Sequence, residues 1–389
     1  MTLEAYIQKA KEAGASDVHL EGGLPAALRV RGALKTLGEP LKPQDLRSIA
    51  QELLNDAEWH DFATRRSFDL AKTIRGVRCR INILHSARGV GFAIRLLSNF
   101  KPTITNLNLH SELSSLVRSH HHGLILASGP TGSGKTSTLA ALVHEINSTE
   151  ARHIITLESP IEYVITPTKS FVRQREVGRD TPSFEQGLYD ALREDPDVLM
   201  VGEMRDPETI RLTLNAAETG HLVLATLHSA TVGEALSRIV SAFAPEIQSG
   251  IAAQLADSLV AVVCQRLVYR DQIHLNVPEC EILLASSAAK AIVRQAQFAK
   301  LQTVLETGGR EGNFSFERYR EWLDRRTDFY IPSAHNLTPL GEDLERPAET
   351  RPTPATKPAP LEGVIEIPDE DDDLSRLMSQ LEKRGNKPK

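Results

Sequence analysis

Aromatic side chains are scarce in this sequence, where Phe, Trp and Tyr make up 5% of 389 residues. Proteins that bind single-stranded nucleic acid stack bases on such side chains, so this class is not favoured. An excess of positive charge is also lacking, because 45 Lys and Arg stand against 51 Asp and Glu and leave a net charge of −6. A protein without a basic field holds a phosphate backbone poorly, and we expect no nucleic-acid partner.

Cysteines are few and long apolar runs are absent. Cys79, Cys264 and Cys280 are far apart and have no metal-ligand spacing, which favours reduced thiols in the cytosol. No apolar run approaches the roughly 20 residues that span a bilayer. The N-terminal residues, Met-Thr-Leu-Glu-Ala-Tyr, do not resemble a signal sequence. We therefore expect a cytoplasmic protein, which could still dock onto a membrane complex.

The pattern of apolar residues predicts an α/β protein with several regions. Residues 1–97 are typical of a small α/β domain, with one helix expected over about 43–64 and an alternating strand over 77–84. Residues 98–112 are expected to form a linker. Over 113–335, apolar strands alternate with helical patterns, which predicts a doubly wound, mostly parallel sheet.

The last region, 336–389, is predicted to be a disordered tail. Seven prolines lie between Pro339 and Pro368, and an acidic run follows. Apolar residues at helical spacing then indicate a short amphipathic helix over 371–384. This helix is either a frayed solubilising end or a peptide that docks onto a partner.

The strongest motif is Gly-Pro-Thr-Gly-Ser-Gly-Lys-Thr at 129–136, which follows an apolar run and precedes a helical stretch. A strand, a glycine-rich loop and a helix in this order form the phosphate-binding loop of nucleotide-binding proteins. Lys135 is expected to reach the β- and γ-phosphates of ATP, and the Thr136 hydroxyl to ligate Mg²⁺. The expected nucleotide-binding residues are Gly129, Pro130, Thr131, Gly132, Ser133, Gly134, Lys135, Thr136 and Ser137.

Two carboxylates follow strand-like segments farther along the chain. Glu158 ends Ile-Ile-Thr-Leu-Glu, and Glu203 ends Val-Leu-Met-Val-Gly-Glu. Such positions place one carboxylate at the metal and another at the attacking water, although spacing alone does not assign the two roles. His228 ends a third strand, where it would contact a γ-phosphate or be structural. The run 120–122 of three histidines is expected to be a solvated loop rather than a metal site.

Together these motifs resemble the type II/type IV secretion ATPase superfamily, and most closely its type IV pilus retraction, PilT-like branch. The motifs shared are the phosphate-binding loop, the Glu158 strand, Asp-Pro-Asp-Val-Leu-Met-Val-Gly-Glu at 195–203 and Glu-Thr-Gly-His…Thr-Leu-His at 218–228. The resemblance spans roughly residues 1–330. It implies a PAS-like N-terminal domain, a RecA-like ATPase domain and a homo-hexameric ring.

The resemblance also implies roles for single residues. Glu158 would be the catalytic base, Glu203 the Walker B carboxylate near Mg²⁺, and His228 part of a histidine box. Arg80 and Arg95 match positions from which the N-terminal domain supplies arginines to bound nucleotide.

The implied function is a Mg²⁺-dependent ATPase motor that powers pilus retraction from the cytoplasmic side of the inner membrane. Its implied partners are a membrane platform protein and a paralogous pilus ATPase. Several departures keep alternatives open. Ser159 stands where the family usually has Asp, 288–295 matches a retraction motif weakly, 311–330 follows the family weakly, and the tail beyond 336 is extra. The alternatives are a motor for secretion or conjugation, or an accessory paralogue that hydrolyses ATP poorly.

Overall fold

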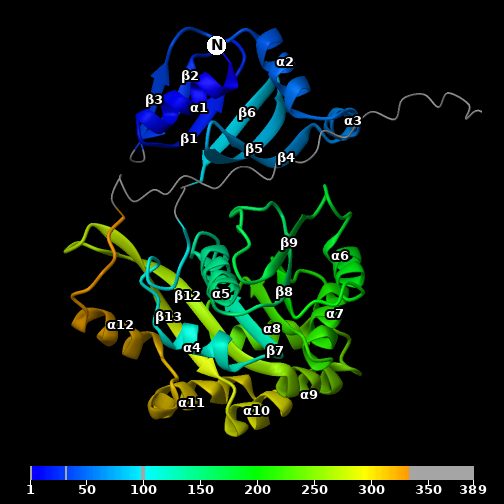
Figure 1. Ribbon diagram of the computed structural model, residues 1–389, viewed down its shortest axis with the longest axis vertical. Helices are drawn as coiled ribbons and strands as arrows, with labels where there is room; N and C mark the ends of the chain where they lie inside the picture. The colour runs from blue at the N-terminus through cyan, green and yellow to red at the C-terminus, as the bar shows by residue number, and fades with distance from the viewer. Residues whose placement is uncertain (1, 31–32, 98–100, 333–389) are drawn as a thin grey trace, which may run out of the picture. The chain divides into compact units, whose positions relative to one another are not determined.

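The computed structural model describes residues 2–30, 33–97 and 101–332. The predicted tail at 336–389, with its helix over 371–384, lies outside these residues, as does part of the predicted linker. The N-terminal part and the C-terminal part of the described chain each contain a β-sheet of their own (Figure 1).

The N-terminal part contains a six-stranded antiparallel sheet with the strand order β3-β2-β1-β6-β5-β4. Three helices share one apolar core with this sheet. The strands are β1 (Ala15–Leu20), β2 (Ala26–Val30), β3 (Ala33–Leu37), β4 (Ser67–Ile74), β5 (Val77–Ser86) and β6 (Gly89–Leu96), and the helices are α1 (Leu3–Glu12), α2 (Pro43–Leu53) and α3 (Asp56–Arg65).

The expected single helix over 43–64 is wrong, because the chain forms two helices there. Asn55 is the N-cap of α3, and its side chain accepts a hydrogen bond from the backbone N–H of Glu58 at 2.9 Å. The Glu58 carboxylate accepts one from the backbone N–H of Asn55, also at 2.9 Å. This capping box starts a new helix, so the helix before it ends at Leu53.

The C-terminal part is built on a seven-stranded sheet with the order β13-β12-β7-β11-β10-β8-β9. All neighbouring pairs are parallel except β12 and β13, which agrees with the predicted doubly wound sheet. The strands are β7 (Gly123–Ser128), β8 (His153–Glu158), β9 (Phe171–Glu176), β10 (Val198–Val201), β11 (Leu222–Leu227), β12 (Leu259–Arg270) and β13 (Leu275–Leu284).

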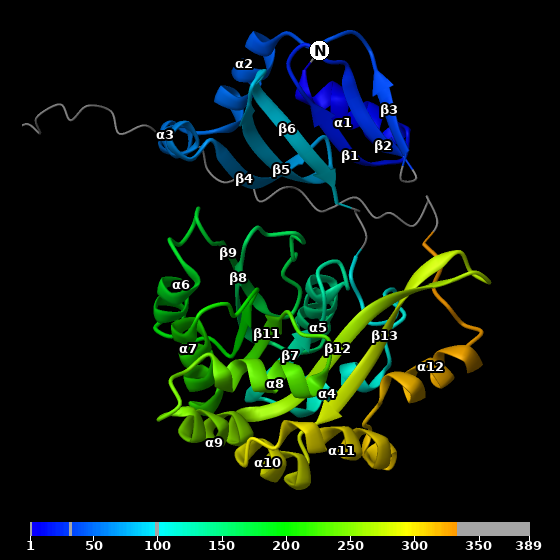
Figure 2. The same ribbon diagram turned by 180° about the vertical axis from the view of Figure 1, so that it is seen from behind.

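Helices cover both faces of this sheet, as the two opposite views show (Figures 1 and 2). Two apolar cores result, because α4, α5 and α12 contribute to one cluster and α6 to α11 to the other. The helices are α4 (Glu112–Ser119), α5 (Lys135–Thr149), α6 (Phe184–Ala191), α7 (Pro207–Glu218), α8 (Val232–Ser241), α9 (Gln248–Ser258), α10 (Ser287–Arg294), α11 (Leu301–Thr307) and α12 (Phe316–Arg325). Parallel strands end at the same edge of such a sheet, and polar residues at the ends of β7, β8, β10 and β11 are thereby brought together.

Candidate nucleotide-binding site

The predicted phosphate-binding loop connects β7 directly to α5. Gly129, Gly132 and Gly134 have φ values of 148°, 81° and 90°, a backbone region that other residues avoid. At Gly129 a Cβ atom would also lie 2.2 Å from the carbonyl oxygen of Gln265, so only glycine fits there. The loop therefore follows the turn that its glycines allow, and its end forms the N-terminus of α5.

Gln265 on β12 holds this loop in place through two side-chain hydrogen bonds. Its side-chain Nε2 donates to the carbonyl oxygen of Ser133 at 2.6 Å, and its Oε1 accepts from the Thr138 hydroxyl at 2.6 Å. Gln265 is 3% exposed, so both hydrogen bonds are shielded from water. Sequence reasoning did not assign this role, since the partners are 132 and 127 residues away along the chain.

Lys135 lies across the loop at the start of α5. Its Nζ donates to the carbonyl oxygens of Gly129 and Pro130 at 2.8 and 3.0 Å. Burial lowers the pKa of Lys135, and the nearby carboxylate of Glu203 partly opposes this. The buried hydroxyl of Ser133 has no hydrogen-bond partner within the described residues.

These features fit an anionic phosphate group. A helix N-terminus carries a partial positive charge, a lysine ammonium lies beside it, and the free Ser133 hydroxyl can donate to an oxygen. Thr136, the expected Mg²⁺ ligand, is the second residue of α5 and half-buried.

His228 connects Lys135 to Glu203. The His228 Nδ1 atom lies 3.4 Å from Lys135 Nζ, and its Nε2 atom lies 3.0 Å from Glu203 Oε1. Because the ammonium can only donate, Nδ1 accepts and Nε2 carries the proton that faces the carboxylate. Burial and the charge of Lys135 lower the pKa of His228, which agrees with a neutral ring.

Glu203 is held in its ionised form. Burial raises its pKa, but the hydrogen bond from Arg205 and the charges of Arg205 and Lys135 lower it below its ordinary value. Arg205 Nη2 lies 2.7 Å from Glu203 Oε2. An ionised carboxylate next to the phosphate-binding loop is the group that a magnesium site requires.

Glu158, at the end of β8, is 4% exposed and has the opposite character. Burial raises its pKa to about 7, although hydrogen bonds from Thr156 and Gln174 oppose the shift. A carboxyl group with a pKa near the working pH can accept a proton from water. The two carboxyl groups therefore differ in environment: Glu158 is buried with a raised pKa, whereas Glu203 is ionised and paired with Arg205.

The loop after Glu158 contacts α5. The Tyr163 hydroxyl and the Ser137 hydroxyl are 2.8 Å apart. Ser137 follows Thr136 directly, so a hydrogen bond links the segment after the expected base to the turn that contains the expected metal ligand.

At the end of β7, the Ser128 hydroxyl donates to the carbonyl of Ser229 at 2.8 Å and accepts from its backbone N–H at 3.0 Å.

Arg80 and Arg95 lie on the N-terminal sheet. They are direct partners in the antiparallel pair of β5 and β6, so their side chains share one face. Arg95 Nε donates to Asp17 Oδ1 at 3.1 Å, and the Arg95 side chain remains largely exposed.

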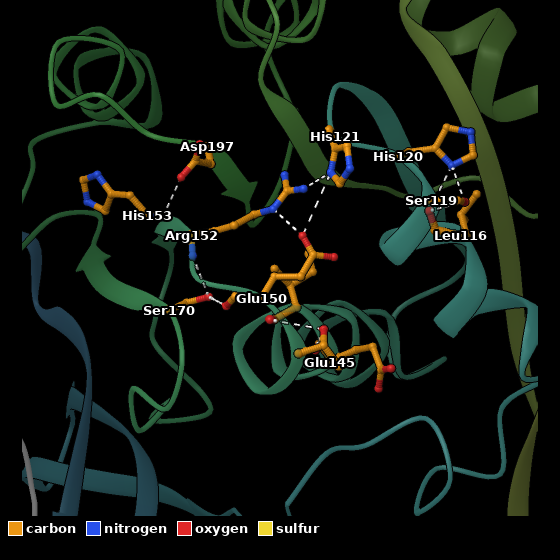
Figure 3. Close-up of polar contacts among 12 residues, drawn as sticks. Leu116, Ser119, His120, His121, Glu145, Glu150, Arg152, His153, Ser170 and Asp197 are labelled. Carbon is orange, nitrogen blue, oxygen red and sulfur yellow. Dashed lines mark hydrogen bonds and ion pairs between the residues drawn. The ribbon is translucent and has the colours of Figure 1, made fainter.

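The histidines of 120–122 lie away from this site, before β7. His120 bonds back to the carbonyl oxygen of Leu116 at 2.9 Å, whereas His121 contacts Arg152 and lies 4.0 Å from Glu150 (Figure 3). The adjacent rings thus have different partners. In the part of the chain that the structure describes, no group of three or more His, Cys, Asp or Glu could hold a metal ion.

Comparison with known proteins identifies the family. The family model described as "Type II/IV secretion system protein" matches residues 1–311. The chain belongs to this family. Its predicted membership of the PilT-like branch and its predicted fold class are confirmed by three relatives.

The type IV pilus retraction ATPase PilT of Pseudomonas aeruginosa is 38% identical over 314 residues, which cover 80% of this chain and 91% of that protein. A twitching motility protein of Neisseria gonorrhoeae is 35% identical over 301 residues, or 77% of this chain and 80% of its own length. The crystal structure of the pilus retraction motor PilT with bound ADP matches with a TM-score of 0.76 and 34% identity, covering 88% of this chain and 98% of that one. Among the described residues, no helix of this family member is long and apolar enough to cross a membrane.

Proposed function

We propose that this protein is an ATP-hydrolysing motor that powers the retraction of a type IV pilus. The observation that carries the proposal is the joint arrangement of a phosphate-binding loop, an ionised Glu203 bonded to His228, and a buried Glu158 with a raised pKa. The relatives that span most of this chain include a retraction ATPase and a twitching motility protein.

Each residue of the site has a separate role in ATP hydrolysis. The N–H groups of the loop, together with Lys135, hold the phosphates, and Glu158 takes a proton from the attacking water. Thr136 and Glu203 would hold Mg²⁺, and the ion would supply positive charge to the phosphates. His228 donates to Glu203 and accepts from Lys135, so it keeps both groups oriented towards the nucleotide.

The motor step involves the N-terminal domain and other copies of the chain. Arg80 and Arg95 contribute positive charge to bound nucleotide, which couples hydrolysis to a movement of that domain. The working unit is a homo-hexamer in the cytoplasm, where it acts on a platform protein of the inner membrane. The family resemblance supports these assignments.

Steady-state hydrolysis of ATP by the wild type and three variants tests the site. We expect Lys135→Ala to lose ATP binding, and Glu158→Gln to bind ATP while kcat falls about 10²–10⁴-fold. Omission of Mg²⁺ should abolish turnover of the wild type, and Glu203→Gln should raise the Mg²⁺ concentration needed for half-maximal activity. Wild-type turnover in Lys135→Ala or Glu158→Gln would contradict the assignment.

A count of surface pili on cells that lack the gene tests the motor role. Excess pili with lost twitching would support retraction, and bald cells would support assembly instead. An unchanged count would favour the accessory or secretion roles. The accessory alternative rests on Ser159 and on the unusual tail beyond residue 336. Of these, Ser159 lies within the described residues, where its side chain is exposed. Because Glu158 keeps hydrogen bonds from Thr156 and Gln174 without an acid at position 159, an active enzyme is favoured.

A further inference from the structure

The side chain of Gln174 on β9 is fully engaged at the end of the neighbouring strand β8. Its Nε2 donates to Glu158 Oε1 at 3.0 Å and to the carbonyl oxygen of Tyr163 at 2.9 Å. Its Oε1 accepts from the backbone N–H of Ile165 at 2.7 Å. The Ile165 N–H requires an acceptor, so the amide has one orientation and its NH₂ group faces Glu158.

A second donor reaches the same oxygen of Glu158. The Thr156 hydroxyl donates to Oε1 at 2.7 Å from within β8. Among the residues that the structure describes, no group donates a hydrogen bond to Oε2 of Glu158. The two carboxylate oxygens therefore differ: Oε1 accepts two hydrogen bonds, and Oε2 keeps its lone pairs for another partner.

We infer that Gln174 is a positioning residue for ATP hydrolysis, which together with Thr156 holds Oε1 so that Oε2 receives the proton of the attacking water. The inference rests on the proposed function, because it takes Glu158 as the base. In this step a water O–H bond breaks and its proton moves to Oε2, while the water oxygen bonds to the γ-phosphorus. The electron pair of the broken P–O bond leaves with ADP.

The pKa of Glu158 is the measurable quantity that tests this inference. Burial raises the pKa of Glu158, the donors Thr156 and Gln174 lower it, the charge of Glu162 raises it, and that of Arg78 lowers it.

On β9, Glu176 is the register partner of Glu158, and its Oε2 accepts from the backbone N–H of Ile161 at 3.3 Å. A donor to the ionised form favours that form, so removal of the Gln174 amide raises the pKa of Glu158 further.

The experiment measures kcat at saturating ATP from pH 5.5 to 9 for the wild type and its variants. In Gln174→Leu, we expect the midpoint of the acidic limb to move up by about one pH unit, a tenfold change in proton affinity. The KM for ATP and the rate on the alkaline plateau should stay within a few-fold of the wild type. Thr156→Val removes the other donor and should shift the midpoint in the same direction.

Gln186→Leu is the matched control. Gln186 is an exposed residue of α6 that bonds to Asp190 at 2.8 Å, so its profile should be that of the wild type. Gln174→Glu keeps the shape and an acceptor for Ile165 while it adds a like charge beside Glu158, and its midpoint should also rise. This variant decides the question if Gln174→Leu does not fold.

Two results would overturn the inference: an unchanged midpoint in the Gln174 variants, or an equal loss of rate at every pH, which a purely structural role produces. Failure of the proposed function looks different. In that case Glu158→Gln would hydrolyse ATP as fast as the wild type, or the wild type would show no turnover at all.

Discussion

Replacement of Gln265 by leucine removes a buried amide that joins β12 to the phosphate-binding loop. Leucine has a similar volume, so the change leaves no large cavity. Two polar groups lose their partner, namely the carbonyl oxygen of Ser133 and the hydroxyl of Thr138. A buried polar group left without a partner costs about 1–3 kcal/mol.

The two losses are unequal. The Thr138 hydroxyl lies on α5, where it can turn and donate to the carbonyl oxygen of Gly134 four residues earlier, as Ser and Thr do in helices. Within the described residues, Gln265 is the one donor to the Ser133 carbonyl. We therefore expect the free energy of unfolding to fall by about 2 kcal/mol, near the cost of one orphaned group rather than two.

Thermal unfolding followed by circular dichroism measures this loss. A fall of about 2 kcal/mol corresponds to a decrease in Tm of about 4–8 °C for a domain of this size. Because the loop that Gln265 supports would hold the phosphates, the Kd for ADP should rise at least about tenfold, or 1.4 kcal/mol.

Thr138→Val alone and combined with Gln265→Leu completes a double-mutant cycle, and the second substitution should add little to the first. An unchanged Tm together with an unchanged Kd would refute the role given to Gln265.

Three other predictions concern separate parts of the chain. Gly129→Ala should lower the unfolding free energy by about 3–5 kcal/mol, because its Cβ would lie 2.2 Å from the Gln265 carbonyl oxygen. Gly132→Ala has open space around its Cβ and should lower the unfolding free energy by about 1 kcal/mol. Urea unfolding measures both changes. The Glu279 carboxylate is fully buried, and although burial raises its pKa, hydrogen bonds from two arginines lower it below its ordinary value of 4.5. The stability that ionised Glu279 contributes is therefore fully present above pH 4.5 and is lost as the pH falls through the lower folded pKa. Glu279→Gln should flatten the dependence of unfolding free energy on pH in this acidic range. An equally steep loss of stability with falling pH in both proteins would contradict the prediction. Arg80→Ala should leave stability within about 0.5 kcal/mol by urea unfolding but reduce kcat at least about tenfold, and unchanged turnover would remove Arg80 from the mechanism.

The sequence alone predicted the parts of the site that depend on local spacing. The phosphate-binding loop needs a strand, three glycines and a helix in order, and all of these are contiguous at 124–147. Glu158 and Glu203 could be placed at the same edge of the sheet because parallel strands end together. The proposed division into base and metal ligand could not be predicted from spacing, since it is argued from burial at Glu158 and from Arg205 beside Glu203.

The supporting residues could not be predicted because their contacts are set by the fold. Gln265 and Ser133 meet only when β12 pairs with β7, and Gln174 reaches Glu158 only when β9 pairs with β8. A glutamine on a strand gives no sequence signal of this kind. The error at 43–64 has a local cause, since Asn55 followed three residues later by Glu58 is a capping box that the apolar pattern concealed.

The position of β9 has a consequence for the timing of catalysis. β9 is one of the two edge strands of the seven-stranded sheet, and within the described part of the chain it pairs only with β8. Edge segments open in local fluctuations at a lower free-energy cost than central strands. When β9 separates from β8, Gln174 no longer donates to Glu158. The proton affinity of the Glu158 carboxylate therefore depends on whether this strand is paired. Amide hydrogen exchange at 171–176 would measure the free energy of this opening, and therefore the fraction of time for which Gln174 is bonded to Glu158.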